Sequence, residues 1–283
     1  MVKQKKLIKK LWNSVNNNSF SKNFFIYKGG KRMGKTGLQF WSIREEMEKD
    51  LLGMIEKVRG MGYAGAQFAG FFDHRAEDVK VKMDEVGIKA AGAHVQINEL
   101  ENQLDQTLKY HETIGNELII IPYLPENMRT TSEDYKRTAA LLNDIGKKMH
   151  ANGFTLGYHN HDFEFDVFDG KTGLDILFEN TDANNLKMEL DCFWAAHTGN
   201  NPVEIIEKYA DRCVSLHIKD MKVEDNQSIS TELGTGTLPL EEYIQKGKEH
   251  HVKWFIVEQE HFTKDPVESA KQNAMEIRRI ITK

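Results

Sequence analysis

Eight short apolar runs recur along the chain from Thr36 onward, and segments with helical spacing lie between them. The runs are rich in Val, Ile, Leu, Phe and Ala, which is typical of strands buried on both faces of a parallel sheet. The pattern therefore predicts strands over residues 37–43, 65–69, 88–97, 117–124, 155–161, 186–194, 213–218 and 254–259.

The segments between the predicted strands carry the apolar stripes and the end signals of helices. One stripe runs through residues 45–61 and another through residues 134–150, with apolar side chains every three or four positions. Asn201 and Pro202 open a shorter helix over 203–209, because Asn caps a first turn and Pro fits within it. Glycine follows four of the segments directly before a strand, at Gly62, Gly87, Gly115 and Gly153. Such a position favours glycine because helices often end in the left-handed conformation.

Alternating strands and helices are typical of a doubly wound sheet or of a closed barrel. The chain contains neither Gly-x-Gly-x-x-Gly nor Gly-x-x-x-x-Gly-Lys-Ser/Thr, so the signatures of nucleotide-binding sheets are missing. Its 283 residues suit one barrel of about 250 residues, and no linker divides them. The sequence therefore predicts an α/β fold, a single-domain (β/α)8 TIM barrel over residues 36–283.

Composition and charge exclude several classes of function. The net charge is −5, which argues against binding a phosphate backbone, and no apolar run reaches the length of a membrane span. Cys192 and Cys213 allow at most one disulfide, so we expect a reduced, cytoplasmic protein. Residues 1–35 are rich in Lys and Arg and lack acidic residues, which predicts a loosely ordered basic extension. The sequence leaves open whether the chain forms a homo-oligomer.

Four polar clusters close four of the predicted strands, at residues 158–161, 189–191, 216–220 and 257–261. Because strand residues alternate between faces, Glu189 shares a face with Asp191, His217 with Lys219, and Glu258 with Glu260. His159 and His161 share one too. A single histidine at a strand end is more often a hydrogen-bonded rim residue, and a single acidic residue there often caps a helix. Four matched clusters instead favour a divalent metal ion held by carboxylates and imidazoles.

The chain resembles the xylose isomerase-like TIM barrels, also called the sugar phosphate isomerase/epimerase family, whose members include inosose dehydratases, ketose 3-epimerases and endonuclease IV. The matching stretches lie at residues 37–44, 65–70, 158–165, 189–199, 216–221, 233–236 and 256–261. The resemblance implies a divalent metal, Mn, Co, Zn or Mg, bound through Glu, Asp, His and Glu on strands five to eight.

Three of these metal ligands match the chain, as Asp191, His217 and Glu258. The glutamate usual on the fifth strand falls at Gly157. His161, nearer the rim, is our preferred substitute, and His159 and Glu164 are the alternatives.

The resemblance also suggests which side chains act on the substrate. Glu258 and His159 are the candidate base and acid, and Lys219 would stabilise an enolate. The expected substrate-binding residues are Gln39, His94, Trp194 and His197. Gln67 stands where relatives often carry Glu, and Arg44 is a further rim candidate.

The preferred function is a metal-dependent isomerase or epimerase of a sugar or sugar derivative, which removes a proton next to a carbonyl and forms an enediolate. A dehydratase or lyase on a keto-sugar or keto-inositol would share that intermediate, so the sequence leaves both open. A sugar-binding barrel without catalysis is a third alternative. The acidic domain disfavours an endonuclease IV-like activity and any nucleic-acid partner.

Overall fold

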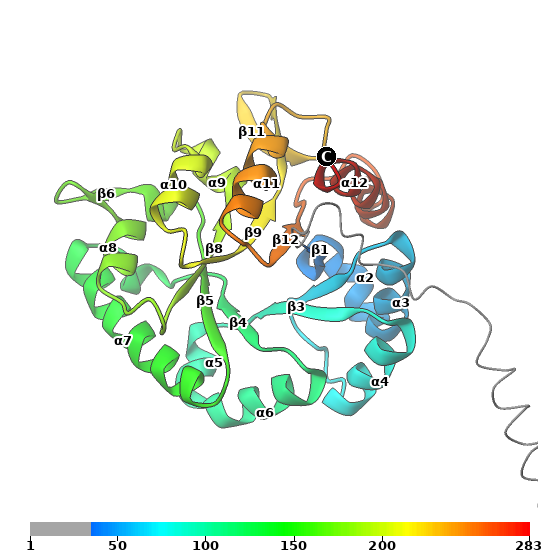
Figure 1. Ribbon diagram of the computed structural model, residues 1–283, viewed down its shortest axis with the longest axis horizontal. Coiled ribbons are helices and arrows are strands. Elements are labelled where there is room, and N and C mark those ends of the chain that lie inside the picture. Colours follow the sequence, from blue (N-terminus) through cyan, green and yellow to red (C-terminus); the bar gives the residue numbers. More distant parts are fainter. Residues whose placement is uncertain (1–34) are drawn as a thin grey trace, which may run out of the picture. The chain divides into compact units, whose positions relative to one another are not determined.

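The computed structural model describes residues 35–283, and eight of its strands close into one parallel barrel (Figure 1). They follow the order β1-β12-β9-β8-β5-β4-β3-β2 around the barrel. The strands are β1 (Lys35–Gln39), β2 (Gly65–Phe68), β3 (Lys89–His94), β4 (Leu118–Ile121), β5 (Thr155–His159), β8 (Lys187–Asp191), β9 (Cys213–Ile218) and β12 (Trp254–Val257). The (β/α)8 barrel and all eight predicted strands are confirmed. The basic extension, apart from Lys35, lies outside the described residues.

Seven of the eight barrel strands end before the last residue of the predicted run, and in two of them a polar side chain at the strand end starts a helical turn. The run 37–43 leaves the barrel at Gln39, whose side chain accepts a hydrogen bond from the backbone N–H of Trp41. The short helix η1 (Phe40–Ile43) begins there. In the same way Asp191 caps α9 (Cys192–His197) within the predicted strand 186–194. Apolar content alone could not separate strand from helix at these two places.

Helices surround the barrel and bury their apolar faces against it (Figure 1). Those preceding the fifth strand are α2 (Arg44–Lys49), α3 (Leu51–Met61), α4 (Ala76–Val86), α5 (Ile97–Asn102), α6 (Leu104–Ile114), η2 (Glu126–Met128) and α7 (Ser132–Ala151). Those following it are η3 (Phe163–Phe165), α8 (Gly173–Glu179), α9, α10 (Pro202–Lys208), α11 (Leu240–Glu249) and α12 (Pro266–Ile281).

The predicted helix signals have the expected structural roles, with one correction. Asn201 caps α10 through a hydrogen bond from the Val203 N–H, and the four predicted glycines all have positive φ. The segment 45–61 is two helices rather than one, because Asp50 leaves the helical conformation and caps α3 through the N–H of Gly53. Both cysteines are buried free thiols. Among residues 35–283, no helix is both long and apolar enough to cross a membrane.

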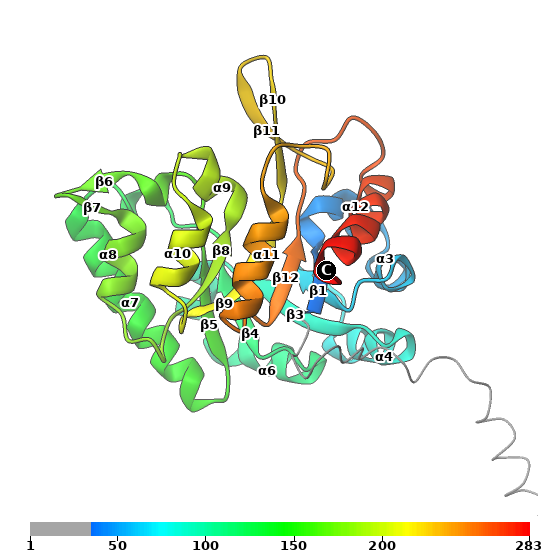
Figure 2. The same cartoon turned by 45° about the horizontal axis from the view of Figure 1, so that its top comes forward.

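Two antiparallel hairpins extend from the barrel loops. The smaller pairs β6 (Val167–Phe168) with β7 (Lys171–Thr172). The larger pairs β10 (Asp220–Glu224) with β11 (Gln227–Thr231) and projects away from the barrel in Figure 2. Asp220 lies at the base of the larger hairpin, where its carboxylate accepts four backbone N–H groups, those of Met221, Gly234, Gly236 and Leu238. This residue therefore fixes the loop that follows the hairpin.

Parallel register brings the polar strand ends together. Asp191 of β8 is the partner of His217 in β9, and His159 of β5 is the partner of Glu189 in β8. Since neighbouring strands present paired residues to the same face, these four side chains enter the barrel next to one another. The site is therefore built on strands and not on loops.

Candidate metal centre

Asp191 is both a helix cap and a candidate ligand. Its Oδ1 atom accepts the backbone N–H of Trp194 at 3.0 Å, which anchors the first turn of α9. Its backbone N–H is held by the side-chain oxygen of Asn160 at 2.9 Å. The other oxygen, Oδ2, is buried and has no hydrogen-bond partner. The cap therefore orients the carboxylate and turns its second oxygen toward cationic partners, of which the Lys219 ammonium lies 3.0 Å away.

Three further side chains face the Oδ2 atom of Asp191. His159, Asp191, His217 and Glu258 each offer one ligand atom, and all four atoms lie within 4.8 Å of one another. Nε2 of His159 and Nδ1 of His217 are 3.7 and 3.8 Å from Asp191 Oδ2. The Glu258 oxygen Oε2 is 2.9 Å from His217 Nδ1. Two imidazole nitrogens and two carboxylate oxygens are a suitable ligand set for Mn²⁺, Co²⁺ or Zn²⁺.

Lys219 brings a positive charge into the same group. It is fully buried, and its ammonium nitrogen lies 3.0 Å from Asp191 Oδ2 and 2.7 Å from Glu258 Oε2. Glu260 is 3.4 Å away and more exposed, at 26% of its side chain. Burial alone would lower the pKa of Lys219, but the surrounding carboxylates raise it above its usual value. The lysine therefore stays charged at neutral pH.

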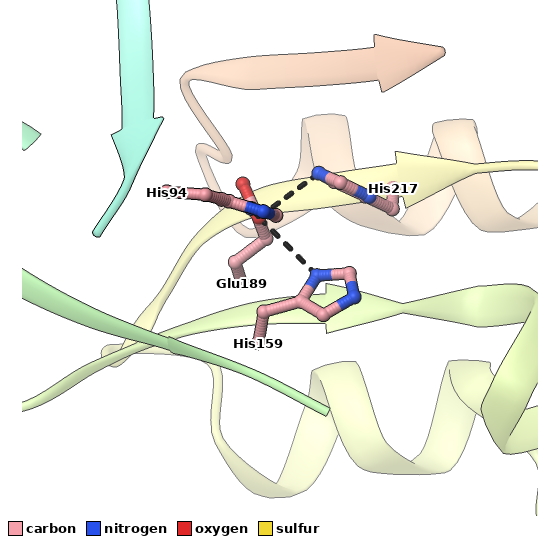
Figure 3. Close-up of side chains that lie close together, drawn as sticks. All are labelled: His94, His159, Glu189 and His217. Atoms are coloured by element: carbon pink, nitrogen blue, oxygen red, sulfur yellow. Dashed lines mark hydrogen bonds and ion pairs between the residues drawn. The ribbon is translucent and has the colours of Figure 1, made fainter. Parts of the chain in front are cut away.

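A second layer lies deeper in the barrel and centres on Glu189 (Figure 3). Its Oε1 atom is 2.8 Å from His94 Nε2, 2.9 Å from His217 Nε2 and 3.3 Å from His159 Nδ1. The carboxylate is fully buried, which by itself would raise its pKa, but the charge of His217 and the imidazole hydrogen bonds hold the pKa well below its usual range. One buried anion therefore contacts three imidazoles.

Two glutamines complete this layer. Gln67 donates to Glu189 Oε2 at 2.5 Å, and its own oxygen accepts from Gln39 at 2.7 Å. Both are fully buried, and the Gln39 oxygen is occupied by the N–H of Trp41. The structure therefore places Gln39, a predicted substrate-binding residue, among hydrogen bonds within the protein. His94, also predicted to bind substrate, lies against Glu189 with only 9% of its side chain exposed.

His161 lies outside both groups of candidate ligands among the described residues. The strand ends at His159, so the alternation that placed His161 on the same face no longer applies two residues later. Its ring stacks on Phe163, and its Nδ1 is buried without a hydrogen-bond partner. Glu164, another alternative for the fourth ligand, bonds to the Tyr158 hydroxyl and the His161 N–H. Burial raises the pKa of Glu164 to about 8.

Aromatic side chains line one side of the candidate centre. Trp194 contacts the His161 ring with centroids 5.7 Å apart, and its indole N–H is buried without a partner. Tyr123 packs on His161 and is 41% exposed. His197 is exposed and packs against Trp194 and Phe193 from one turn further along α9. Arg44 stacks on Trp41 near the first strand.

The sequence pointed to Asp191, His217, Glu258, His159 and Lys219, and the structure brings these five side chains together. It did not identify the role of Glu189, although strand parity put that residue on the same face as Asp191. The alternation of faces shows which side of the sheet a side chain points to, but not how deep in the barrel it lies. It therefore could not distinguish a metal ligand from a carboxylate behind the ligands. Glu260 was noted only for its parity.

The chain is similar to known proteins in sequence and in fold. A family model described as "Xylose isomerase-like TIM barrel" matches residues 55–280. Inosose dehydratase of Geobacillus kaustophilus is 22% identical over 60% of this chain, and the match spans 61% of that relative's length.

Two solved structures have the same fold. A sugar phosphate isomerase/epimerase from Parabacteroides distasonis superposes with a TM-score of 0.74 and 24% identity, over 87% of this chain and 98% of the other. The IOLI protein, which has a bound zinc atom, gives a TM-score of 0.69 and 14% identity over 88% and 98% of the two chains.

Proposed function

Because the chain belongs to the xylose isomerase-like TIM barrel family, we propose that it is a divalent-metal-dependent isomerase or epimerase of a sugar or sugar derivative. The observation that carries the proposal is the convergence of His159, Asp191, His217 and Glu258 within 4.8 Å. The sugar phosphate isomerase/epimerase among the structural neighbours supports the same class of substrate.

The residues present fit a metal ion. Asp191 Oδ2 is a buried carboxylate oxygen with no partner closer than its 3.0 Å ion pair with Lys219, and it faces nitrogens of His159 and His217 at 3.7 and 3.8 Å, a mixed oxygen and nitrogen set that suits a divalent ion. His159, Asp191, His217 and Glu258 would hold the ion, with His159 in place of the glutamate that the resemblance leads one to expect. A bound divalent ion would polarise the substrate carbonyl and the neighbouring hydroxyl.

This ligand set changes the assignment of acid and base. His159 and Glu258 were the expected proton carriers; as metal ligands, His159 would give the electron pair of Nε2 to the ion and Glu258 would give one of its two oxygens. Glu260 remains as a carboxylate beside the group, and its partial exposure lets it reach a substrate from the rim. We assign it the removal of the proton next to the carbonyl. Lys219 then stabilises the negative charge that develops on the oxygen.

The aromatic side of the centre suits the apolar face of a sugar ring. Trp194 and Tyr123 offer ring surface there, and the unpartnered Nε1–H of Trp194 is a hydrogen-bond donor for a hydroxyl. His161 Nδ1 offers a second polar atom in the same place. Together they would hold a polyhydroxylated substrate.

The test is deuterium exchange. The protein, loaded with Mn²⁺ or Zn²⁺ in turn, is incubated in D₂O with a panel of keto-sugars and keto-inositols, and NMR follows the carbon-bound protons next to the carbonyl. We expect exchange in the wild type, loss of both metal and exchange in Asp191→Asn, and loss of exchange with metal retained in Glu260→Gln. A protein that takes up no metal and exchanges no proton on any substrate would refute the proposal.

Dehydration is the second candidate, and the curated relatives named inosose dehydratase favour it. It shares the proton removal but then expels a β-hydroxyl group as water. The same NMR experiment separates the two outcomes, because an isomerase or epimerase conserves the number of hydroxyl groups and a dehydratase does not. Sugar binding without exchange would instead support a non-catalytic barrel, and cleavage of abasic-site DNA at low salt would support a nuclease.

A further inference from the structure

We infer that Glu189 is a positioning residue that fixes the ring tautomers of two metal-binding histidines, so that His159 binds through Nε2 and His217 through Nδ1. The inference rests on the metal centre proposed above. It assigns Glu189 no contact with substrate or metal.

Glu189 faces both histidine rings with its Oε1 atom. Oε2 of Glu189 accepts the side-chain amide of Gln67, and Oε1 faces three imidazole nitrogens, so both oxygens face groups that can donate hydrogen bonds. His217 Nε2 and His159 Nδ1 lie 2.9 and 3.3 Å from its Oε1 atom (Figure 3). The facing carboxylate favours a proton on both nitrogens, through a close contact for His217 and through a longer contact, not a hydrogen bond, for His159.

The opposite nitrogens face the candidate metal position. His159 Nε2 lies 3.7 Å from Asp191 Oδ2, and His217 Nδ1 lies 2.9 Å from Glu258 Oε2. A neutral imidazole has one N–H and one nitrogen with a free electron pair. Glu189 thus favours the proton on Nδ1 in His159 and on Nε2 in His217, and the other nitrogen of each ring faces Asp191 and Glu258. His217 Nδ1 also lies at hydrogen-bond distance from Glu258, so a bound metal would take the place of a proton there.

A chain of hydrogen bonds fixes the His217 tautomer independently of Glu189. The backbone N–H of Trp41 can only donate, so the Gln39 atom that accepts it is oxygen and the other end of that amide is the NH₂ group. The Gln39 NH₂ group donates to Gln67, whose facing atom is therefore oxygen. That oxygen lies 2.7 Å from His217 Nε2, which must donate to it.

Glu189 could in principle be a ligand itself, since it forms a second group with His94, His159 and His217. Both groups need the same two histidines, and one neutral ring cannot bind two ions. Glu189 Oε2 already accepts the Gln67 amide, and His217 Nε2 already faces an amide oxygen, whereas the closest partner of Asp191 Oδ2 is the Lys219 ammonium, a cation in the place that a metal ion would take. This difference favours the Asp191 group as the metal position and Glu189 as the carboxylate behind it.

The direct test needs no variant. Protein labelled with ¹⁵N-histidine is loaded with Zn²⁺, and two-bond ¹H–¹⁵N correlation spectra report which nitrogen of each zinc-bound ring carries the proton. We expect two zinc-shifted rings of opposite kind, one protonated at Nδ1 and one at Nε2. Two zinc-bound rings with the same tautomer would overturn the inference.

A substitution tests the role of Glu189 in metal affinity. Glu189→Gln replaces one acceptor oxygen by an NH₂ group, which competes for the imidazole nitrogens. We expect one zinc ion per chain to remain, with a dissociation constant raised about 10–100-fold in chelator competition. Glu232→Gln is the matched control, because Glu232 is also buried and bonds to Ser269 rather than to any proposed ligand. Its zinc affinity should match that of the wild type.

The outcomes separate the inference from the proposed function. Complete loss of zinc in folded Glu189→Gln, as expected for Asp191→Asn, would make Glu189 a ligand, and unchanged affinity would remove its role. Either result overturns the inference alone. Wild-type protein that binds zinc with opposite tautomers but exchanges no proton would overturn only the reaction. Wild-type protein that binds neither Zn²⁺ nor Mn²⁺ would overturn both.

Discussion

Replacing Lys219 by methionine removes a buried cation from between two carboxylates while keeping a side chain of similar length. The ammonium lies 3.0 Å from Asp191 Oδ2 and 2.7 Å from Glu258 Oε2, and all three side chains are at most 5% exposed. Without it, two buried anions face each other with no lysine to compensate them. Breaking a buried ion pair by removing one partner costs about 3–5 kcal/mol. We expect the unfolding free energy of the metal-free variant to fall by that amount.

A divalent ion should restore part of this loss, because it binds the same two oxygens in the folded state and not in the unfolded chain. Ligand at one hundred times its dissociation constant adds about 2.7 kcal/mol to the stability of a protein. The lysine also repels an incoming cation, so Lys219→Met should bind Mn²⁺ more tightly than the wild type does. Its catalytic exchange should nevertheless be lost, since the oxyanion loses its ammonium partner.

The assay is urea unfolding followed by tryptophan fluorescence, in EDTA and in excess Mn²⁺. Lys246→Met is the matched control, because Lys246 also pairs with two glutamates, Glu207 and Glu249, but on the surface. Solvent-screened pairs contribute little, so this variant should stay near the wild type under both conditions. Equal stability of Lys219→Met and wild type in EDTA would refute the buried ion-pair argument. An equal response of both to Mn²⁺ would refute the competition between lysine and metal.

Three further predictions concern the scaffold. Burial lowers the pKa of His111 to about 4, from about 6.5 in an unfolded chain, so the folded state loses stability as pH falls between these values. Across that pH window, the unfolding free energy of His111→Asn, measured with urea, should therefore fall by up to about 3 kcal/mol less than that of the wild type. Parallel pH profiles of the two proteins would contradict this. Asp220→Ala leaves four backbone N–H groups without their acceptor and should reduce the unfolding free energy by on the order of 4 kcal/mol, whereas a loss below about 1 kcal/mol would show that water replaces them. Gly146→Ala would place a methyl group 1.9 Å from the Asn185 carbonyl oxygen, and thermal unfolding should show an unfolding free energy lower by about 1–3 kcal/mol or more. Unchanged stability would show that α7 shifts to make room for the methyl group.

The fold could be predicted because strands and helices carry different periods and because glycine marks where one passes to the other. The errors lie where one polar residue changes the backbone within an apolar run. Gln39 and Asp191 both end strands by capping a helical turn, and Asp50 divides a helix whose apolar stripe continues across it. Periodicity averages over several residues, so it cannot register a single side-chain hydrogen bond to the backbone.

The site could be predicted only in part, for a related reason. Asp191, His217 and Glu258 follow from strand parity and from the resemblance. The fourth position depended on where β5 ends. Parity was carried past the last paired residue to His161, whereas the chain turns after His159. The layer around Glu189 depends on contacts between side chains far apart in the sequence, such as Gln67 with Glu189. No local pattern encodes those contacts.

One physical explanation accounts for both the histidine at position 159 and the glutamate at position 189. The His159 ring lies between two carboxylates, with Nδ1 toward Glu189 and Nε2 toward Asp191. A glutamate at position 159 would bring a third buried anion next to these two, at high electrostatic cost. An imidazole instead can turn an N–H group toward one carboxylate and an electron pair toward the other. A histidine at position 159 is therefore compatible with the buried carboxylate of Glu189, whereas a glutamate at position 159 would not be. The departure from the family pattern is thus consistent with a centre that still binds metal.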